Sequence, residues 1–509
     1  MAPQLDISEF LVDRPSVLSR ITALAVCVTV GYLLWSVIYN LFISPLRKIP
    51  GPKLWAISPL PQALMQCSGT PHRKILALHQ KYGDVVRISP RSVSFLDPVA
   101  WKELYGHRKA GQPENLKDPG FFKEINRGVI GANSEDHSRM RRILANGFSA
   151  QQMIKQEPLL RGYIDLLFKR MREASDSGRS VDMVRWYNYT TFDLIGDLAF
   201  GEPFGCLEAS NYHSWVAMIF ASFKQKQVLI QIRRAYPTLE ALFNPVLQFF
   251  IAKTVQENAK LTEMKVAKRL ALGSSRPDFM EAMASPDASG KQKMSLTEIH
   301  HNADILIVAG SETTATTLCG VTSLLCTHPE VLAKLSAEIR SSFETEAEIT
   351  LLTVQRLKYM TAVIDEGMRI FPAASASVPR IIHQGGDVVC GKYLPAGTTV
   401  DIWHWPMYHN PKNFTLPESF IPERWMGDPR FANDKKEAFQ PFSTGGRNCL
   451  GKNLAYAEMR LILSRLIWNY DISLADEKDK DWVNKQGLFG LWEKPPLNIN
   501  LMSGFKTIQ

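Results

Sequence analysis

One uninterrupted apolar stretch stands out in the hydrophobic pattern of this chain. Residues 21–43 contain no charged side chain and are mostly hydrophobic. As an α-helix the stretch would be roughly 35 Å long, enough to cross a bilayer with some tilt. Arg47 and Lys48 follow it and acidic residues precede it, so the positive-inside rule places the C-terminal side in the cytosol. The pattern predicts a lumenal stub over 1–20 and a transmembrane anchor helix over 21–43. A cleaved signal peptide is the alternative.

A proline-rich segment over 44–52 separates this anchor from the rest of the chain. Proline forbids helix continuation, so the segment is expected to act as a stiff hinge. The remainder, 53–509, is expected to form one large body. Short strands are predicted near Val85–Ile88 and Ser92–Leu96, with turn residues between them.

Most of the body has the periodicity of α-helices. Helices are predicted over Glu135–Phe148, Ser295–His328 and Leu351–Phe371. The stretch Gly111–Ser134 is rich in glycine, proline, asparagine and charge, and is interpreted as a long loop of a kind that is often functional. The stretch Val228–Ile251 is apolar and aromatic. It forms either a pair of core helices or a surface that dips into the bilayer.

The longest helical pattern, Ser295–His328, starts with a capping box and carries an unusual centre. A glycine inside a helix costs about 1 kcal/mol relative to alanine, so Gly310 calls for a reason. Gly310 and Thr313 share a face, and Glu312 adds a proton source beside them. One interpretation is a notch that holds a small molecule such as O2. The other is a packing glycine and a threonine bonded back to its own helix.

A second helix places Glu366 and Arg369 three residues apart on one face, where they can pair. An exposed pair of this kind stabilises by under about 1 kcal/mol. Arg424, in the sequence Pro-Glu-Arg-Trp, offers a third partner. These residues predict a Glu–Arg–Arg network that braces the core.

The most specific motif of the chain reads Phe442-Ser-Thr-Gly445-Gly-Arg447-Asn-Cys449-Leu-Gly451. Its pattern is typical of a loop that presents one cysteine to a haem iron. The glycines allow a tight backbone, and Arg447 offers a fork of donors to a carboxylate such as a haem propionate. A helical pattern follows Cys449, so its sulfur is expected at a helix N-terminus, which favours the thiolate. A buried structural cysteine is the alternative. Beside this loop, the notch at Gly310 becomes the favoured interpretation.

Composition adds limits on the class of protein. The chain has 509 residues, a formal net charge of +9 and 45% hydrophobic residues, enough for a large core. Because no basic run is interleaved with aromatic residues, we expect no nucleic-acid binding. The seven cysteines are scattered and form no C-x-x-C pair, which argues against a zinc site and a secreted disulfide framework.

Taken in order, the Ala309–Thr314 segment, the Glu366/Arg369 pair, the Pro-Glu-Arg-Trp segment and the Cys449 loop resemble the cytochrome P450 superfamily over positions 45–509. The resemblance implies a mainly α fold, a multihelical triangular prism with a small β region. It implies haem b (heme, iron protoporphyrin IX) as cofactor and Cys449 as the metal ligand. Thr313 and Glu312 would be the catalytic residues that deliver protons during oxygen activation.

Other residues are assigned to the cofactor by the same resemblance. Haem propionates would meet His137 and Arg141 of an early helix, with histidine where the family usually has tryptophan, and also Arg380 and Arg447. The cofactor-binding set is then His137, Arg141, Gly310, Arg380, Phe442, Gly445, Arg447, Cys449 and Gly451. Substrate-pocket walls are expected from Gly111–Ser134, Cys206–Leu247, Ile305–Thr313, Ala373–Val378 and Leu488–Leu491. These walls are mostly apolar, so a lipophilic substrate is expected.

The N-terminal layout resembles the microsomal type, which implies a single-pass protein of the endoplasmic reticulum with a cytosolic catalytic domain. Electrons would come from NADPH through a separate cytochrome P450 reductase, with cytochrome b5 as a further candidate partner. Segments such as Gly391–Thr398 are similar to fungal secondary-metabolism members, including trichothecene hydroxylases. The expected function is therefore a monooxygenase acting on a natural-product intermediate. A haem-thiolate enzyme of rearrangement, dehydration or ring coupling, and a non-catalytic haem sensor or carrier, are the alternatives.

Overall fold

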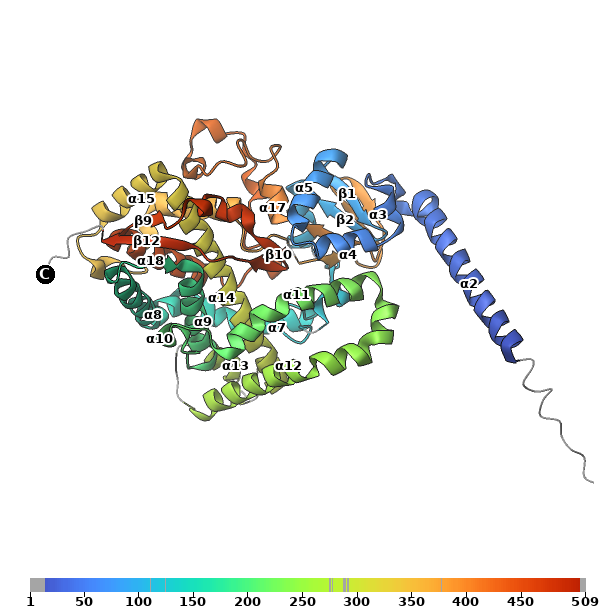
Figure 1. Ribbon diagram of the computed structural model, residues 1–509, viewed down its shortest axis with the longest axis horizontal. Helices are drawn as coiled ribbons and strands as arrows, with labels where there is room; N and C mark the ends of the chain where they lie inside the picture. Colours follow the sequence, from blue (N-terminus) through green and yellow to red (C-terminus); the bar gives the residue numbers. More distant parts are fainter. Residues whose placement is uncertain are drawn as a thin grey trace, which may run out of the picture.

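A projecting helix and a mainly helical body make up the computed structural model (Figure 1). The structure describes residues 14–109, 111–123, 125–273, 276, 278–286, 290, 293–376 and 378–503, without the side chains of 14–16, 219, 221 and 243–255. Most of the predicted stub, 1–20, therefore lies outside the described residues. The first described helix, α2 (Arg14–Ile38), leads away from the body.

The helices of the body follow the chain in a simple order. The longer ones are α5 (Pro71–Tyr82), α7 (Ser134–Ala145), α8 (Ala150–Asp176), α9 (Met183–Phe200), α11 (Ser214–Ala235), α12 (Pro237–Ala271), α14 (Leu296–Thr327), α15 (Pro329–Ser342), α16 (Lys358–Ile370) and α18 (Lys452–Asn469). The short ones are α3 (Lys53–Ile57), α4 (Leu60–Gln66), α6 (Pro119–Phe122), α10 (Cys206–Ala209), α13 (Phe279–Ala284) and α17 (His404–Tyr408).

Small sheets complete the body. Five strands pair in the order β1 (Val85–Ser89), β2 (Ser92–Phe95), β8 (Thr399–Ile402), β5 (Arg380–Ile381) and β3 (Leu116–Lys117). The other sheets are β4 (Val181–Asp182), β12 (Asn498–Ser503) and β9 (Tyr470–Leu474); β10 (Gly487–Phe489) and β11 (Leu491–Glu493); and β6 (Asp387–Val389) and β7 (Lys392–Leu394). The mainly α fold and both predicted strands of the first hairpin are confirmed.

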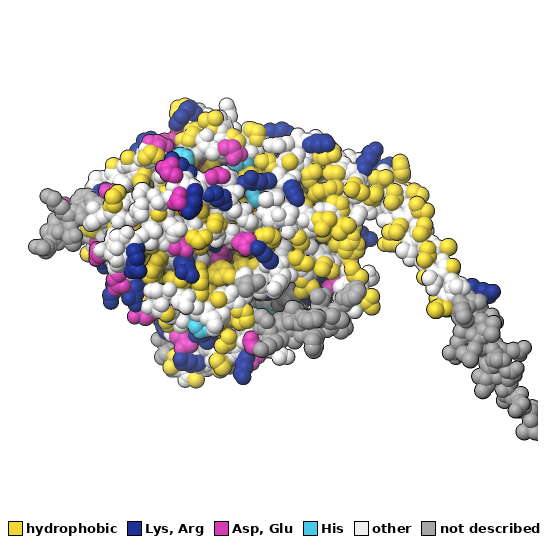
Figure 2. Space-filling model, viewed as in Figure 1, with side chains coloured by type: hydrophobic (Ala, Val, Ile, Leu, Met, Phe, Trp, Pro, Cys, Tyr) yellow, Lys and Arg dark blue, Asp and Glu magenta, His cyan; other side chains and the backbone are white. Residues whose placement is uncertain are grey.

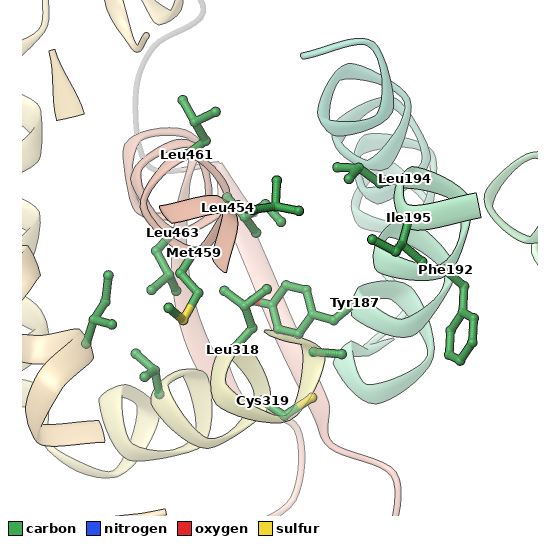
Figure 3. Packing of buried hydrophobic residues seen from close by; sticks show 14 of the residues in the cluster. Tyr187, Phe192, Leu194, Ile195, Leu318, Cys319, Leu454, Met459, Leu461 and Leu463 are labelled. Atoms are coloured by element: carbon green, nitrogen blue, oxygen red, sulfur yellow. The ribbon is translucent and has the colours of Figure 1, made fainter. Parts of the chain in front are cut away.

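The core forms where α14 passes through the body between α9 and α18 (Figure 3). Leu318 and Cys319 of α14 are fully buried between Tyr187 of α9 and Met459 of α18. The cap of α14 is the predicted capping box, in which the Ser295 side chain accepts from the Glu298 N–H and the Glu298 side chain accepts from the Ser295 N–H. This long, rigid helix fixes the positions of Gly310, Glu312 and Thr313.

The anchor is joined to the body by a defined contact. Its apolar stretch, 17–43, has a mean hydropathy of 2.1 and is long enough to cross a membrane. The buried Arg87 of β1 donates to the backbone oxygen of Asn40 (2.8 Å) and to its side-chain oxygen (2.9 Å). The following Pro45–Lys48 segment is a 3-10 turn. The predicted hinge is therefore folded against β1 at both ends, since the Arg87 N–H also donates to the Pro50 oxygen.

Apolar side chains gather on the surface where the anchor meets the body (Figure 2). Leu54 of α3 is 64% exposed, and Leu60 and Leu64 of α4 are 46% and 62% exposed. Grouped exposed leucines are unusual on a protein that faces water on all sides. Their position beside α2 suits contact with the bilayer surface.

Three predicted segments differ from the structure. The helix predicted over Leu351–Phe371 begins only at Lys358, because Thr350 and Thr353 bond to each other and to nearby backbone groups in a turn. The Gly111–Ser134 segment contains β3 and α6 rather than loop alone. The Val228–Ile251 stretch is shared by α11 and α12, which break at Tyr236; the side chains after Leu242 lie outside the described residues.

Candidate active site

The loop that carries Cys449 folds back on itself. The Cys449 N–H donates to the Phe442 carbonyl oxygen (N···O 2.8 Å). Gly445 has a φ of +76°, and a Cβ on it would lie 2.0 Å from the Tyr105 carbonyl oxygen. Only glycine fits there. Helix α18 begins directly after Gly451, as the helical pattern predicted.

The side chain of Cys449 lies at the start of α18. Its side chain is accessible, yet burial raises the pKa of its thiol. The N–H groups of Gly451 and Lys452 and the charge of Arg141 lower that pKa only in part. The helix start thus acts in the predicted direction, but burial outweighs it. A metal cation on the sulfur would supply the missing stabilisation of the thiolate.

The cysteine loop is fastened to α7 through Arg141. Arg141 Nη1 donates to the Asn448 carbonyl oxygen (2.6 Å), and Nη2 donates to the Asn448 side-chain oxygen. Arg141 therefore holds the residue that directly precedes Cys449. Arg141 is expected to contact a haem propionate. The structure adds a second role, which is to position the cysteine loop.

A second accessible stretch lies at the centre of α14. Ala309 is exposed and Thr313 partly exposed, although most of the helix around them is buried. Since α14 packs against α18, the two accessible stretches lie on neighbouring elements. A cysteine and a threonine that are accessible on two elements packed against each other suit the two faces of a flat, apolar cofactor.

The structure changes the explanation of Gly310. A Cβ on this residue would lie 2.6 Å from Ile195 Cδ1, so the glycine allows α9 to approach α14. Thr313 Oγ1 donates to the Ala309 carbonyl oxygen (2.8 Å). Both contacts belong to the alternative interpretation, a packing glycine and a back-bonded threonine. The notch predicted at Gly310 is therefore wrong on the side that Ile195 fills, while Thr313 stays accessible.

Glu312 has a charged partner that the sequence did not indicate. Its Oε1 accepts from Lys494 Nζ and from Thr316 Oγ1, the latter at 3.3 Å. The side chains of Glu312 and Lys494 are only 2% and 3% exposed. The acid beside Thr313 is thus half of a buried ion pair.

The predicted propionate ligands gather around a carboxylate of the chain itself. Arg447 Nε donates to Glu114 Oε1 (2.6 Å), and Arg380 Nη1 donates to the same oxygen (3.3 Å). Burial raises the pKa of Glu114, but the hydrogen bonds from Arg447 and Ser134 outweigh it and lower the pKa to about 2. Two of the arginines assigned to the cofactor therefore already bind one carboxylate.

More positive charge stands there than one carboxylate can neutralise. Burial, with Arg380 and Arg447 beside it, lowers the pKa of Lys117 to about 6. Burial and the neighbouring Arg447 and Arg141 likewise lower the pKa of His137 to about 4, so it is neutral at pH 7. The positive charge of the arginines disfavours protonation of Lys117 and His137. The same positive charge favours the binding of further anions. The residues present therefore fit the two propionates of haem.

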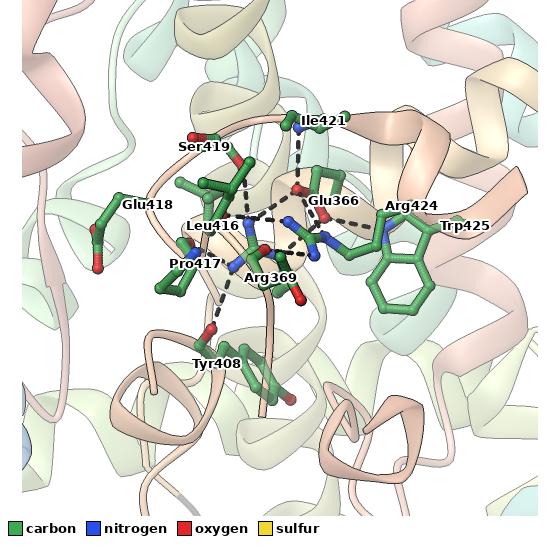
Figure 4. A network of polar contacts seen from close by, with 12 residues as sticks. Glu366, Arg369, Tyr408, Leu416, Pro417, Glu418, Ser419, Ile421, Arg424 and Trp425 are labelled. Carbon is green, nitrogen blue, oxygen red and sulfur yellow. Dashed lines mark hydrogen bonds and ion pairs between the residues drawn. The ribbon is translucent and has the colours of Figure 1, made fainter. Parts of the chain in front are cut away.

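Glu366, Arg369 and Arg424 meet in the core, as Figure 4 shows. Arg369 binds the Glu366 carboxylate through two donors (2.8 and 2.9 Å), and Arg424 Nε lies 3.4 Å from Oε1. Trp425 Nε1 and the Ile421 N–H complete the carboxylate's partners. All three predicted side chains are 0% exposed.

The network has a fourth charged member that the sequence did not indicate. Asp434, also 0% exposed, pairs with Arg424. Arg369 further donates to the backbone oxygens of Pro417 (2.6 Å) and Ser419 (2.9 Å). With two carboxylates against two guanidinium groups the cluster is neutral, and it ties α16 to the segment that leads to the cysteine loop.

Glu114, Lys494 and Asp434 were missed because nothing near them in the sequence marks them. Glu114 and Lys494 meet their partners across long stretches of chain, and Asp434 meets Arg424 ten residues away, a spacing that no helix or strand period reports. The one usable signal was the charged, glycine-rich composition around Glu114, which indicated a functional segment but not its partner.

The arrangement defines a class, a haem-thiolate protein. The cytochrome P450 family model matches residues 49–500, and the chain belongs to the cytochrome P450 family. It is therefore an oxygen-incorporating oxidoreductase that holds haem through a cysteine thiolate.

Curated relatives match nearly the whole chain. Trichothecene C-15 hydroxylase of Fusarium sporotrichioides is 46% identical over 474 residues, covering 93% of this chain and 96% of the relative. Averantin hydroxylase of Dothistroma septosporum is 43% identical over 478 residues, covering 92% and 90%. Cytochrome P450 monooxygenase astA of Talaromyces wortmannii is 42% identical over 498 residues, covering 96% and 98%. The resemblance to P450 monooxygenases of fungal secondary metabolism is confirmed.

Proposed function

We propose that this protein hydroxylates a lipophilic natural-product intermediate, using O2 and electrons that come from NADPH through a separate reductase. The observation that carries the proposal is an accessible cysteine directly before α18 and an accessible threonine on α14, which packs against α18, within a P450 chain. Two similar proteins are named as hydroxylases, of trichothecene and of averantin. These names support hydroxylation as the reaction of this chain. Its own substrate is to be identified by experiment.

When bound, haem supplies the redox centre that activates O2, and the Cys449 thiolate favours O–O cleavage. The chain's own residues do the rest. Arg141 holds the cysteine loop, and Arg380 and Arg447 anchor carboxylates at the cofactor edge. Thr313 presents an accessible hydroxyl. This hydroxyl donates its proton to the Ala309 carbonyl oxygen, so its own oxygen can still accept a hydrogen bond. Glu312 is the adjacent acid that replenishes the protons consumed.

Metabolite comparison tests this function directly. Extracts from a host that carries the wild-type chain and a reductase should contain an oxygenated product that is missing when Cys449→Ala replaces it. The same metabolites in both strains would contradict the proposal. An isomer or a dehydrated product in place of an oxygenated one would favour the rearrangement or dehydration reaction.

Thr313→Ala should separate electron consumption from product formation. Removing the hydroxyl takes away a positioned acceptor for the water that delivers the proton, and one group of a proton-transfer system contributes about 10²–10⁴ in rate. We expect the ratio of product to NADPH consumed to fall at least about tenfold, with electrons lost as hydrogen peroxide, while the reduced-CO spectrum persists. Thr327→Ala is the matched control, because Thr327 bonds back to Ser323 on the same helix in the same way (3.1 Å). An equal ratio in wild type and Thr313→Ala would make Thr313 a packing residue.

We further propose that 21–43 anchors the protein in the endoplasmic reticulum, with 1–20 lumenal, 44–52 as connector and the catalytic domain 53–509 cytosolic. The apolar helix and the exposed leucines beside it support this. A cytosolic body can meet the reductase, and cytochrome b5, on the Cys449 side. Arg142 and Lys452 are exposed there, whereas Arg139 is paired with Glu298 and Asp136.

Protease added to sealed microsomes should digest the body without detergent, because Arg47 and Lys48 and the exposed lysines beyond them face the cytosol. The chain has two N-glycosylation motifs, at Asn188 and Asn413, but their glycosylation would not report the topology. The two sequon asparagines, Asn188 and Asn413, are each only 2% exposed. A lumenal marker should stay intact in the same sample. Protection of the body until detergent is added would reverse the topology.

A further inference from the structure

A cavity of about 440 Å³ lies against the acid of the proposed active site. Among the described residues its walls come from α9, α11, α14 and the β10–β11 hairpin. Aromatic side chains such as Tyr212, Phe220 and Trp492 line most of it, and Glu312 and Lys494 form its buried polar end. Thr313, one residue along, is not part of this lining. Glu312 is therefore the member of this lining that directly precedes Thr313 in α14.

The carboxylate of Glu312 is held at one oxygen and open at the other. Oε1 accepts from Lys494 and Thr316, whereas Oε2 is buried without a hydrogen-bond partner among the described groups. A buried oxygen of this kind is normally satisfied by an ordered water. Because Oε2 is closed to water as the side chain stands, a small rotation of the carboxylate would bring it to the water of the adjoining cavity. Oε2 is thus the oxygen through which a proton can reach the carboxylate.

Lys494 is itself fixed by its surroundings. It directly follows β11 and precedes two prolines, which restrict its backbone. The Pro495 carbonyl oxygen accepts from Nε1 of the fully buried Trp482 (3.0 Å). Nζ of Lys494 also lies 2.8 Å from Thr316 Oγ1. The ammonium group therefore meets Glu312 from a rigid support rather than from a flexible surface chain.

We propose that Lys494 is a positioning residue for proton supply. By binding Oε1 it fixes the Glu312 carboxylate at the polar end of the cavity and leaves Oε2 without a partner among the described groups. After a small rotation of the carboxylate, Oε2 takes a proton that bulk solvent supplies through cavity water. The proton then passes on toward Thr313, and the carboxylate, again ionised, returns to its pair with Lys494. This inference rests on the proposed monooxygenase function and assigns its water route.

Lys494→Met should lower the ratio of product to NADPH consumed by about tenfold, because a mispositioned acid loses most of its contribution. Lys494→Arg, which keeps the charge, should retain most of the ratio. In a Glu312→Gln background Lys494→Met should cause no further loss, since it acts through Glu312. The control is Lys265→Met, which breaks a partly buried pair with Glu202 (2.8 Å) outside the cavity and should leave the ratio unchanged.

A second readout does not depend on turnover. Lys494→Met leaves a buried carboxylate unpaired and should lower the melting temperature by several degrees, and adding Glu312→Gln should recover most of that loss. An unchanged ratio in Lys494→Met, an equal fall in the Glu312→Gln background, or additive melting temperatures would overturn the inference. Absence of any oxygenated product from wild type, with the melting temperatures coupled as expected, would instead count against the proposed function alone.

Discussion

Replacing Cys449 by alanine should abolish the long-wavelength band of the reduced-CO spectrum and all product formation. The band reports a thiolate on the haem iron, and Cys449 is the accessible thiol in the loop that Arg141 and Gly445 hold in place. The rest of the body should still fold, because Cys449 is not part of the buried core. The measurement is the reduced-CO difference spectrum at equal protein concentration.

Cys326→Ala is the matched control for this variant. Cys326 lies near the end of α14 in a partly buried position, away from the cysteine loop. It should keep the band and the activity. A persistent thiolate band in Cys449→Ala, or its loss in Cys326→Ala, would contradict the assignment of Cys449 as the metal ligand.

Glu366→Gln should cause the largest loss of stability among the substitutions considered. The carboxylate accepts from Arg369, Arg424, Trp425 and the Ile421 N–H, all in a site closed to water. Removing one member of a buried ionic cluster costs about 3–5 kcal/mol, because the remaining charges stay buried without compensation. That is a large part of the total stability of most domains, about 5–15 kcal/mol.

The expected outcome is a lower denaturant midpoint and less haem-loaded protein, measured by unfolding monitored through fluorescence and by the haem-to-protein ratio. Lys412→Met is the control, because the Lys412–Asp84 pair is exposed on both sides and should contribute little. Equal midpoints for Glu366→Gln and Lys412→Met would show that the network is not structural.

The parts of the structure that the sequence predicted depend on local chemistry. The anchor, the capping box at Ser295 and the cysteine loop each depend on one short, contiguous run of residues. The turn that delays α16 to Lys358 was missed, because side-chain bonds between Thr350 and Thr353 compete with the helix there. Hydrophobic periodicity does not report such bonds.

The parts of the site that were missed depend on tertiary contacts. Gly310 was interpreted from its neighbour in sequence, whereas its reason is Ile195 on another helix. Arg447 was assigned a carboxylate, and the structure adds Glu114 as a carboxylate partner from the chain itself. Glu312 was assigned to proton supply without the lysine that holds it. In each case the partner comes from a distant part of the chain.

The most direct test of the account is the origin of the oxygen in the product. The wild-type protein, with reductase and NADPH, is incubated with the metabolite that it consumes, under ¹⁸O₂ and ordinary water. A monooxygenase should give a product that contains one ¹⁸O atom per oxidation step, as measured by mass spectrometry. A product whose new oxygen comes from water, or one that forms without any gain of oxygen, would contradict the assignment of this chain as a monooxygenase.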